Sequence, residues 1–457
     1  MKTKLSICRP VTNALPVCAR RFQGTLRYPI RLFALVAALA VPSPEHVAGQ
    51  DVEPAAEEVD PAAPVPGANL AVSLVTFGPG DIFWESFGHN ALWVENRTTG
   101  QGILYHWGLF DFAEPGFVPR FLKGEMIYSM GAGDPTRTFQ AYEGVDRSIT
   151  VQELNLTPAQ RLELFRLADE NLQDPRYRYD IFLDNCSTRV RDLIDRVSGG
   201  ALQESARAAP GHDYWFHVAR LTQHRPEVLL GMEIFLGNGG SRPITHWDAA
   251  FTPLVLDEIV REATVLVDGT PAPLVAEERV LYEDSRAAEP AFPTPYVWIV
   301  AVIGLFAAGV LGLAAWSAGK GGWPGRAAFA LIGGGWSFVA GLLGSILVSG
   351  FLTDHHWMFW NENLLQFTPL SLALAVLVPK AALSGQRGMW VGRLALLVAG
   401  LSVLGWVLQI LPGLDQRNGE LLSITVPLHL ALVWGLTRLP LAPGAMRPGG
   451  FPAPEKR

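Results

Sequence analysis

Apolar residues are distributed unevenly along the 457-residue chain. One apolar run, LFALVAALAV, lies near the N-terminus, and five more lie in the last third. Between them, residues 70–267 mix alternating, strand-like segments with segments of helical spacing, and their length suits one domain. The pattern therefore predicts a folded domain that is followed by a group of membrane-spanning helices.

The first 50 residues have the order of a secretory signal peptide. Basic residues precede the apolar run, prolines end it, and the small residues Ala48 and Gly49 follow, as expected before a cleavage site. The run is short for a membrane span, although an uncleaved anchor is the alternative interpretation. Residues 51–69 are acidic and rich in Pro and Ala without periodicity, which predicts a disordered linker.

The five C-terminal runs predict a transmembrane domain of five helices over residues 296–439. The first, second and fourth runs are long enough to span a bilayer, whereas the third and fifth need their flanking residues. The runs are 296–316, 327–352, 364–378, 394–411 and 421–436.

The loops between these runs predict their orientation. Loops 317–326 and 379–393 and the tail 440–457 carry Lys and Arg, whereas loop 353–363 carries neither and loop 412–420 only Arg417. By the positive-inside rule the tail is cytoplasmic, and five spans then place the folded domain outside. Residues 268–295, which again carry Pro and charge, are expected to be a juxtamembrane connection.

Composition narrows the classes of function. The net charge of −7, with a pI near 5.8, argues against nucleic acid as a partner. Only 17% of the residues are charged while 49% are hydrophobic, which suits a membrane protein.

One of the 3 cysteines remains unpaired if the protein is exported. Cleavage of the signal removes Cys8 and Cys18, so Cys186 has no intramolecular partner. Such a thiol is buried and inert, forms an intermolecular link, or is reactive. In DNCSTRVRDLID the apolar spacing predicts a helix that begins at Cys186, with Asp184 or Asn185 as its N-cap. We expect the helix N-terminus to lower the pKa of this thiol.

Two histidines are candidate bases for this thiol. His89 begins the alternating run HNALWV, directly after Gly88, and His106 lies in a second run, GILYHWGLF. A lone histidine in a strand is usually structural, and Cys186 could itself be a small core residue. The histidines become candidates because they occur together with a cysteine at a helix start.

This arrangement resembles the permuted papain-like fold of NlpC/P60 peptidases and lecithin:retinol acyltransferase-like enzymes. The resemblance implies an α+β domain in which Cys186 is the nucleophile, His89 the general base and His106 the group that orients the imidazole. It also implies that Cys186 attacks a carbonyl carbon while His89 takes its proton.

A closer resemblance is to the bacterial Lnb-type lipoprotein N-acyltransferase family, an exported papain-like domain followed by membrane spans. It rests on five segments: FGHNALWV, YHWGLFDF, YRYDIFLDNCSTRVRDLID, SRPITHWDAAFTPLVL and TDHHWMFWNEN. It implies a multi-pass protein of the bacterial inner (cytoplasmic) membrane with its catalytic domain in the periplasm. A phospholipid would be the acyl donor, and the N-terminal amine of a diacylated lipoprotein the acceptor.

Further candidates lie near these motifs. Asn185, Arg189, His355 and His356 are candidate substrate-binding residues, the last two in an outer-face loop that could meet a lipid head group. Adjacent histidines alone are weak support for a metal site, so neither a metal nor a cofactor is predicted. His212, His217, His224 and His246 have no partner that the sequence identifies. Two other functions stay open, a cell-wall cysteine peptidase or amidase and a non-catalytic membrane sensor or scaffold.

Overall fold

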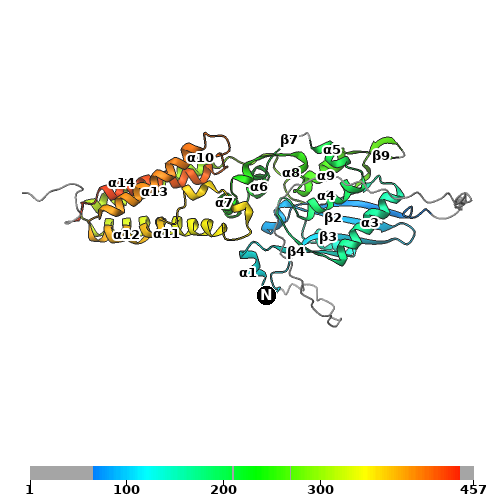
Figure 1. The fold of residues 1–457 in the computed structure, drawn as a ribbon, viewed down its shortest axis with the longest axis horizontal. Coiled ribbons are helices and arrows are strands. Elements are labelled where there is room, and N and C mark those ends of the chain that lie inside the picture. The colour runs from blue at the N-terminus through cyan, green and yellow to red at the C-terminus, as the bar shows by residue number, and fades with distance from the viewer. Residues whose placement is uncertain (1–64, 208–209, 268, 443–457) are drawn as a thin grey trace, which may run out of the picture. The chain divides into compact units, whose positions relative to one another are not determined.

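The computed structural model describes residues 65–207, 210–267 and 269–442 (Figure 1). These residues belong to one compact unit, residues 62–457. The predicted signal peptide, most of the predicted linker and all but the first residues of the predicted cytoplasmic tail lie outside the described residues.

A seven-stranded antiparallel sheet is the centre of the N-terminal domain (Figure 1). Its strand order is β11-β5-β1-β2-β3-β4-β6. In that order the strands are β11 (Val275–Tyr282), β5 (Ile149–Leu154), β1 (Leu70–Phe77), β2 (His89–Asn96), β3 (Gln101–Leu109), β4 (Ile127–Gly133) and β6 (Arg176–Arg178). The hairpin β2–β3 confirms that the two histidine-bearing runs are neighbouring strands.

The two faces of this sheet are buried under different helices. One face, which includes Leu92 and Tyr105, packs against α3 (Pro158–Gln173), α4 (Cys186–Val197) and α9 (Pro253–Glu262). The other face, which includes Phe77 and Ala91, packs against side chains of α2 (Pro135–Glu143). Successive side chains of a strand point to opposite faces, so these two cores account for the alternation in the sequence.

Smaller elements complete the domain. The two-stranded sheets are β7 (Pro210–Asp213) with β8 (Pro243–Thr245), and β9 (Thr264–Val267) with β10 (Thr270–Pro273). The short helices are η1 (Phe83–Phe87), α1 (Phe117–Leu122), α5 (Ala201–Ala206), α6 (Tyr214–Thr222), α7 (Pro226–Phe235), η2 (Asn238–Ser241) and α8 (His246–Ala249).

Part of the expected juxtamembrane connection is instead sheet. Within residues 268–295, strand β11 pairs with β5 and forms an edge of the seven-stranded sheet. Its residues Ala276 to Leu281 are all exposed. The strand therefore lacks the alternation of buried and exposed side chains by which a sequence pattern reveals a strand.

Four of the five predicted spans have the length and composition of membrane-crossing helices within the described residues. They are α10 (Val297–Gly319), α11 (Trp323–Gly350), α13 (Met389–Leu408) and α14 (Gly419–Thr437). The third apolar run forms a shorter helix, α12 (Ser371–Ser384), of 14 residues. Such a helix is about 21 Å long, less than a bilayer core, so the count of five spans is not confirmed.

The chain before α12 is non-helical but buried against the helices. Asn363 and Gln366, around the short helix η4 (Glu362–Leu365), have no exposed side-chain surface. Gly341 and Gly344 of α11 allow this approach, because a Cβ there would lie 2.5 Å from Leu372 N and 2.3 Å from Phe367 O. The polar side chains are satisfied internally, as Gln366 accepts from Ser402 at 2.5 Å and Thr425 at 2.7 Å. Irregular chain at membrane depth requires such shielding.

Candidate functional site

Helix α4 begins at Cys186, as the sequence predicted. Asn185 is its N-cap, and the Asn185 side-chain oxygen accepts from the N–H groups of Ser187 and Thr188, both at 2.9 Å. The Asn185 amide nitrogen donates to the carbonyls of Ile181 and Phe251, also at 2.9 Å. Because both ends of this buried side chain are used, Asn185 fixes the start of the helix rather than facing solvent.

Cys186 lies against strand β3 at a glycine. A Cβ on Gly108 would be 3.5 Å from Cys186 Cβ and 3.6 Å from the Tyr179 ring. Gly108 has a φ of +81°, a conformation that other residues rarely adopt, and it lies at the register shift between His106 and Leu109. The strand therefore bends at the place where the thiol approaches it.

The half-buried thiol has a raised pKa, contrary to the sequence expectation. Burial raises the pKa of Cys186, while the main-chain N–H groups of Asn90, Ser187 and Cys186 itself lower it, as does the charge of Arg147. The helix N-terminus thus acts in the expected direction, but desolvation is larger. The thiol is consequently protonated at neutral pH and needs a base.

His89 and His106 meet at the start of β2. His89 Nε2 lies 3.0 Å from His106 Nδ1, and the rings stack with centroids 5.3 Å apart. Both imidazoles lie on the α2 side of the sheet, 5.9 and 6.3 Å from the Phe77 ring. Within the described residues, His89 thus hydrogen-bonds to His106 and not to the thiol.

The site is therefore assembled from two faces of the sheet at one strand end. Helix α4 covers the opposite face and packs on strands β2 and β3, and the Asn90 N–H, directly after His89, is among the groups that lower the pKa of Cys186. The Nδ1 atom of His89 is not part of the hydrogen bond to His106. In a neutral imidazole one nitrogen donates and the other accepts, so a donating Nε2 leaves Nδ1 as a free acceptor.

Both histidines are uncharged at neutral pH. Burial lowers the pKa of His89 well below its usual value, and the neighbouring His106 and Arg147 lower it further. Burial alone lowers the pKa of His106 to about 4. A neutral imidazole can accept a proton, so the pair suits a general base with its orienting partner.

Arg147 is a buried cation at this site that the sequence did not identify. Its Nε donates to Gly78 O at 2.8 Å, its guanidinium lies 4.6 Å from the Tyr142 ring centroid, and Glu85 is 3.6 Å away. Only 4% of Arg147 is exposed. A single arginine before a strand has no sequence pattern that indicates a role. Only the fold brings Arg147 close to the site of His89 and Cys186.

The side chains of the other candidate residues form contacts within the protein. Arg189 pairs with Asp184 and lies over the Tyr177 ring at 4.2 Å. His355 Nε2 lies 2.7 Å from Phe121 O, and His356 Nε2 lies 3.0 Å from Asp180 Oδ2. These contacts explain how the side chains are held, and substrate binding by them stays a prediction.

The loop after α11 holds the turn that precedes the thiol. Trp357 Nε1 lies 3.0 Å from both carboxylate oxygens of Asp180. Asp180 Oδ1 also accepts from the N–H groups of Phe182 and Leu183 at 2.9 Å, and the backbones of Asp180 and Asp184 bond to each other. The membrane-domain loop thereby fixes the residues leading into Cys186.

Trp357→Phe should weaken this support while keeping the ring against Phe182. A hydrogen bond to a charged group contributes about 1.5–3 kcal/mol, so the turn should loosen and the N–H groups at the sulfur should shift. We expect the pH midpoint of Cys186 alkylation by iodoacetamide to rise, with roughly tenfold slower alkylation at neutral pH. Trp360→Phe, in the same loop but 78% exposed, is the control, and identical profiles for both would contradict this role.

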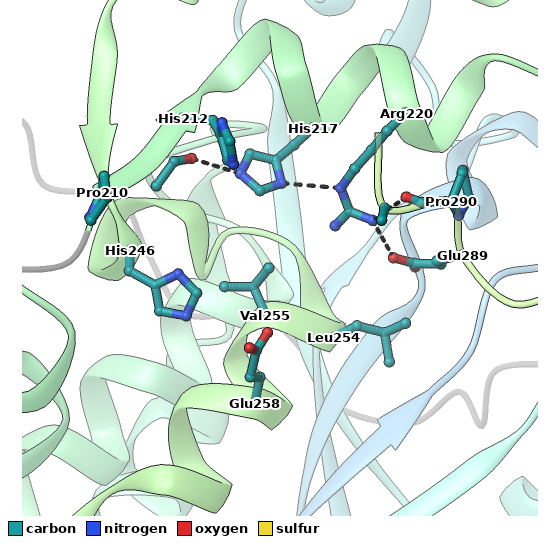
Figure 2. A pocket seen from close by; sticks show the side chains of 12 residues that line it. Pro210, His212, His217, Arg220, His246, Leu254, Val255, Glu258, Glu289 and Pro290 are labelled. Atoms are coloured by element: carbon teal, nitrogen blue, oxygen red, sulfur yellow. Dashed lines mark hydrogen bonds and ion pairs between the residues drawn. The ribbon is translucent and has the colours of Figure 1, made fainter. Parts of the chain in front are cut away.

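A separate cavity gathers three of the four histidines whose partners the sequence does not identify, and His224 is not among its lining residues (Figure 2). It has a volume of about 370 Å³, and His212, His217 and His246 line it. His217 Nε2 lies 2.9 Å from Gly211 O, and its Nδ1 accepts from Arg220 at 3.4 Å. Burial lowers the pKa of His217 to about 4. The cavity is not lined by the cysteine or the two histidines of the candidate site.

Among the described residues, no group of three or more His, Cys, Asp or Glu side chains could hold a metal ion. At the candidate site the described side chains are a thiol, two neutral imidazoles and a buried guanidinium.

Together these observations define a membrane protein with an N-terminal α/β domain that carries a thiol at the start of α4 and a pair of histidines on strands β2 and β3 of the same sheet. Residues 60–219 match the family model described as the Lnb N-terminal periplasmic domain, which supports the resemblance to the Lnb family and an N-terminal domain of periplasmic type. The matched range includes His89, His106 and Cys186. Searches of curated proteins and of solved structures found no match.

Proposed function

We propose that the protein is a thiol acyltransferase that moves an acyl chain from a phospholipid, through a thioester on Cys186, to the N-terminal amine of a lipoprotein. One observation carries the proposal. Helix α4, which begins at Cys186, packs on the two strands that carry a neutral histidine pair, in a domain that matches the Lnb model and that a loop of the membrane helices contacts. The permuted papain-like description of the fold belongs to the same proposal.

In the first half-reaction, His89 acts as the base and Cys186 as the nucleophile. His89 Nδ1 takes the thiol proton as Sγ attacks the ester carbonyl carbon, and the resulting imidazolium donates through Nε2 to His106. The oxyanion of the tetrahedral intermediate meets the Cys186 N–H, since the Asn185 cap already accepts from the N–H groups of Ser187 and Thr188. His89 then returns the proton to the leaving alkoxide, which departs as a lysophospholipid and leaves the thioester.

The second half-reaction transfers the acyl group to an amine. The amine nitrogen attacks the thioester carbonyl, its proton passes to His89, and the thiolate leaves and is reprotonated. Water would compete at this stage, so the buried surroundings of the two histidines support transfer over hydrolysis. A phospholipid and a diacylated lipoprotein are both held in a membrane, which favours an inner-membrane location for the protein.

The decisive experiment is mass spectrometry of mature lipoprotein N-termini in the natural host, with and without this gene. We expect an amide-linked acyl chain on the N-terminal cysteine in its presence and a free amine in its absence. A deletion strain complemented with the wild-type gene is the control. Unchanged lipoprotein masses together with altered cell-wall peptides would instead support the cysteine peptidase.

A further inference from the structure

An exposed apolar surface lies next to the candidate site, on η1, on the segment before α1 and on α1 itself. Its six side chains are between 38% and 65% exposed, and we name them the aromatic lip: Phe83, Trp84, Phe112, Val118, Phe121 and Leu122. Ring contacts join its parts, from Phe83 to Trp84 at 4.8 Å and from Trp84 to Phe112 at 5.5 Å. A contiguous exposed apolar patch usually marks an interaction surface.

The aromatic lip adjoins the end of a membrane-spanning helix. Just after α11 ends, Asp354 N donates to Lys123 O at 2.7 Å, and His355 Nε2 lies 2.7 Å from Phe121 O. Leu352, between these contacts and α11, is 88% exposed. The apolar surface of the spans therefore continues onto α1 through this loop.

A line of aromatic rings leads from the aromatic lip to the thiol. Trp84 contacts Phe110 at 5.6 Å, Phe110 contacts Tyr128 at 5.0 Å, and Tyr128 stacks on Tyr179 at 4.2 Å. Tyr179 and Cys186 both lie next to Gly108, on the side where a side chain would project. Aromatic rings therefore lead from the exposed lip to Tyr179, which packs against the same core as Cys186.

We propose that the aromatic lip docks into the lipid surface of the membrane that the helices cross, and that acyl chains reach Cys186 over it. The partner is a bilayer, because the lip continues the apolar surface of the spans. Trp and Phe suit the membrane interface, and the exposed Lys123 beside them suits phosphate head groups. Docking stands on its own, whereas delivery of the acyl chain rests on the proposed function.

A depth measurement tests the docking with a matched pair of leucines. Leu122 on the lip and Leu266 in β9 are both 65% exposed, but β9 is in a separate hairpin (Figure 1). Each would be replaced by cysteine and spin-labelled in the full-length chain, with its three native cysteines changed to serine. The protein would be held in nanodiscs of phosphatidylethanolamine and phosphatidylglycerol.

Lipid insertion is read as the ratio of collision rates with oxygen and with a water-soluble nickel chelate. We expect a ratio at least about fivefold higher at position 122 than at position 266, because apolar oxygen concentrates in the bilayer. Equal ratios at the two positions would overturn the docking, whatever the enzymatic activity is.

A second measurement tests delivery of the acyl chain. Leu122→Glu should slow thioester formation on Cys186 from a nanodisc phospholipid about tenfold, since a carboxylate disfavours the apolar interface. Leu266→Glu should leave it unchanged, and alkylation by iodoacetamide should be equal in both variants. Equal thioester rates would overturn delivery. If the wild type forms no thioester, the proposed function has failed while the spin-label result still decides docking.

Discussion

Cys186→Ser should remove the acyl-enzyme intermediate and lower lipoprotein acylation by at least about 1,000-fold. Serine keeps the size of the side chain and leaves the Asn185 cap intact, so α4 should still form. The lost property is nucleophilicity. A neutral imidazole can remove a proton from a thiol, even one whose pKa burial has raised, far more readily than from an aliphatic hydroxyl.

The measurement is the intact mass of the protein after incubation with a phospholipid of defined acyl chains. The wild type should gain the mass of one acyl group, and neutral hydroxylamine should remove it, as expected of a thioester. The double variant Cys8→Ser/Cys18→Ser is the matched control and should behave like the wild type. An adduct of normal yield on Cys186→Ser would assign the nucleophile to another residue.

The parts of the site that could be predicted are those with a local signal. The apolar spacing after Asn185 indicates where α4 begins, because the cap and the buried stripe both belong to one helix. The runs around His89 and His106 could be recognised as neighbouring strands, since a tight connection between alternating segments favours a hairpin. Local pattern was sufficient for these elements, whereas the pairing of His89 with His106 was implied by the family resemblance.

The parts that could not be predicted depend on contacts between distant residues. Arg147 reaches the site only because β5 lies beside β1, and Trp357 reaches Asp180 from 177 residues away. The sign of the thiol pKa shift also depends on burial, which the helix start alone does not reveal. Edge strand β11 was missed because an exposed strand lacks an alternating pattern, and the third apolar run was predicted as a span although its helix α12 has only 14 residues.

The membrane domain changes how the site is understood. Its loop supports the turn before Cys186 through Asp180, and the same loop contacts α1 beneath the aromatic lip. A soluble hydrolase would not need contacts from a loop between membrane helices to hold its nucleophile in place. This connection favours a substrate that comes from the bilayer, and it predicts that the excised domain would have a less well-ordered thiol.

His89→Gln should lower the rate of thioester formation by roughly 100- to 10,000-fold, the range for loss of a general base. Glutamine can still contact His106, but it cannot accept the thiol proton. His106→Ala should have a smaller effect, about tenfold, because it frees the His89 ring without removing the base. His106→Asn should restore most of the rate, since an amide oxygen can accept from His89 Nε2 in place of His106 Nδ1.

The pH profile distinguishes this mechanism from a preformed ion pair. The base works as a neutral imidazole, which exists above its pKa, and burial lowers the pKa of both histidines, that of His106 to about 4. Activity should therefore persist as the pH falls below 6.5, while alkylation of the thiol should rise only at alkaline pH because burial raises its pKa. His246→Gln, in the separate cavity, should leave both profiles unchanged. Fast alkylation that stays constant down to pH 5 would show a thiolate–imidazolium pair instead.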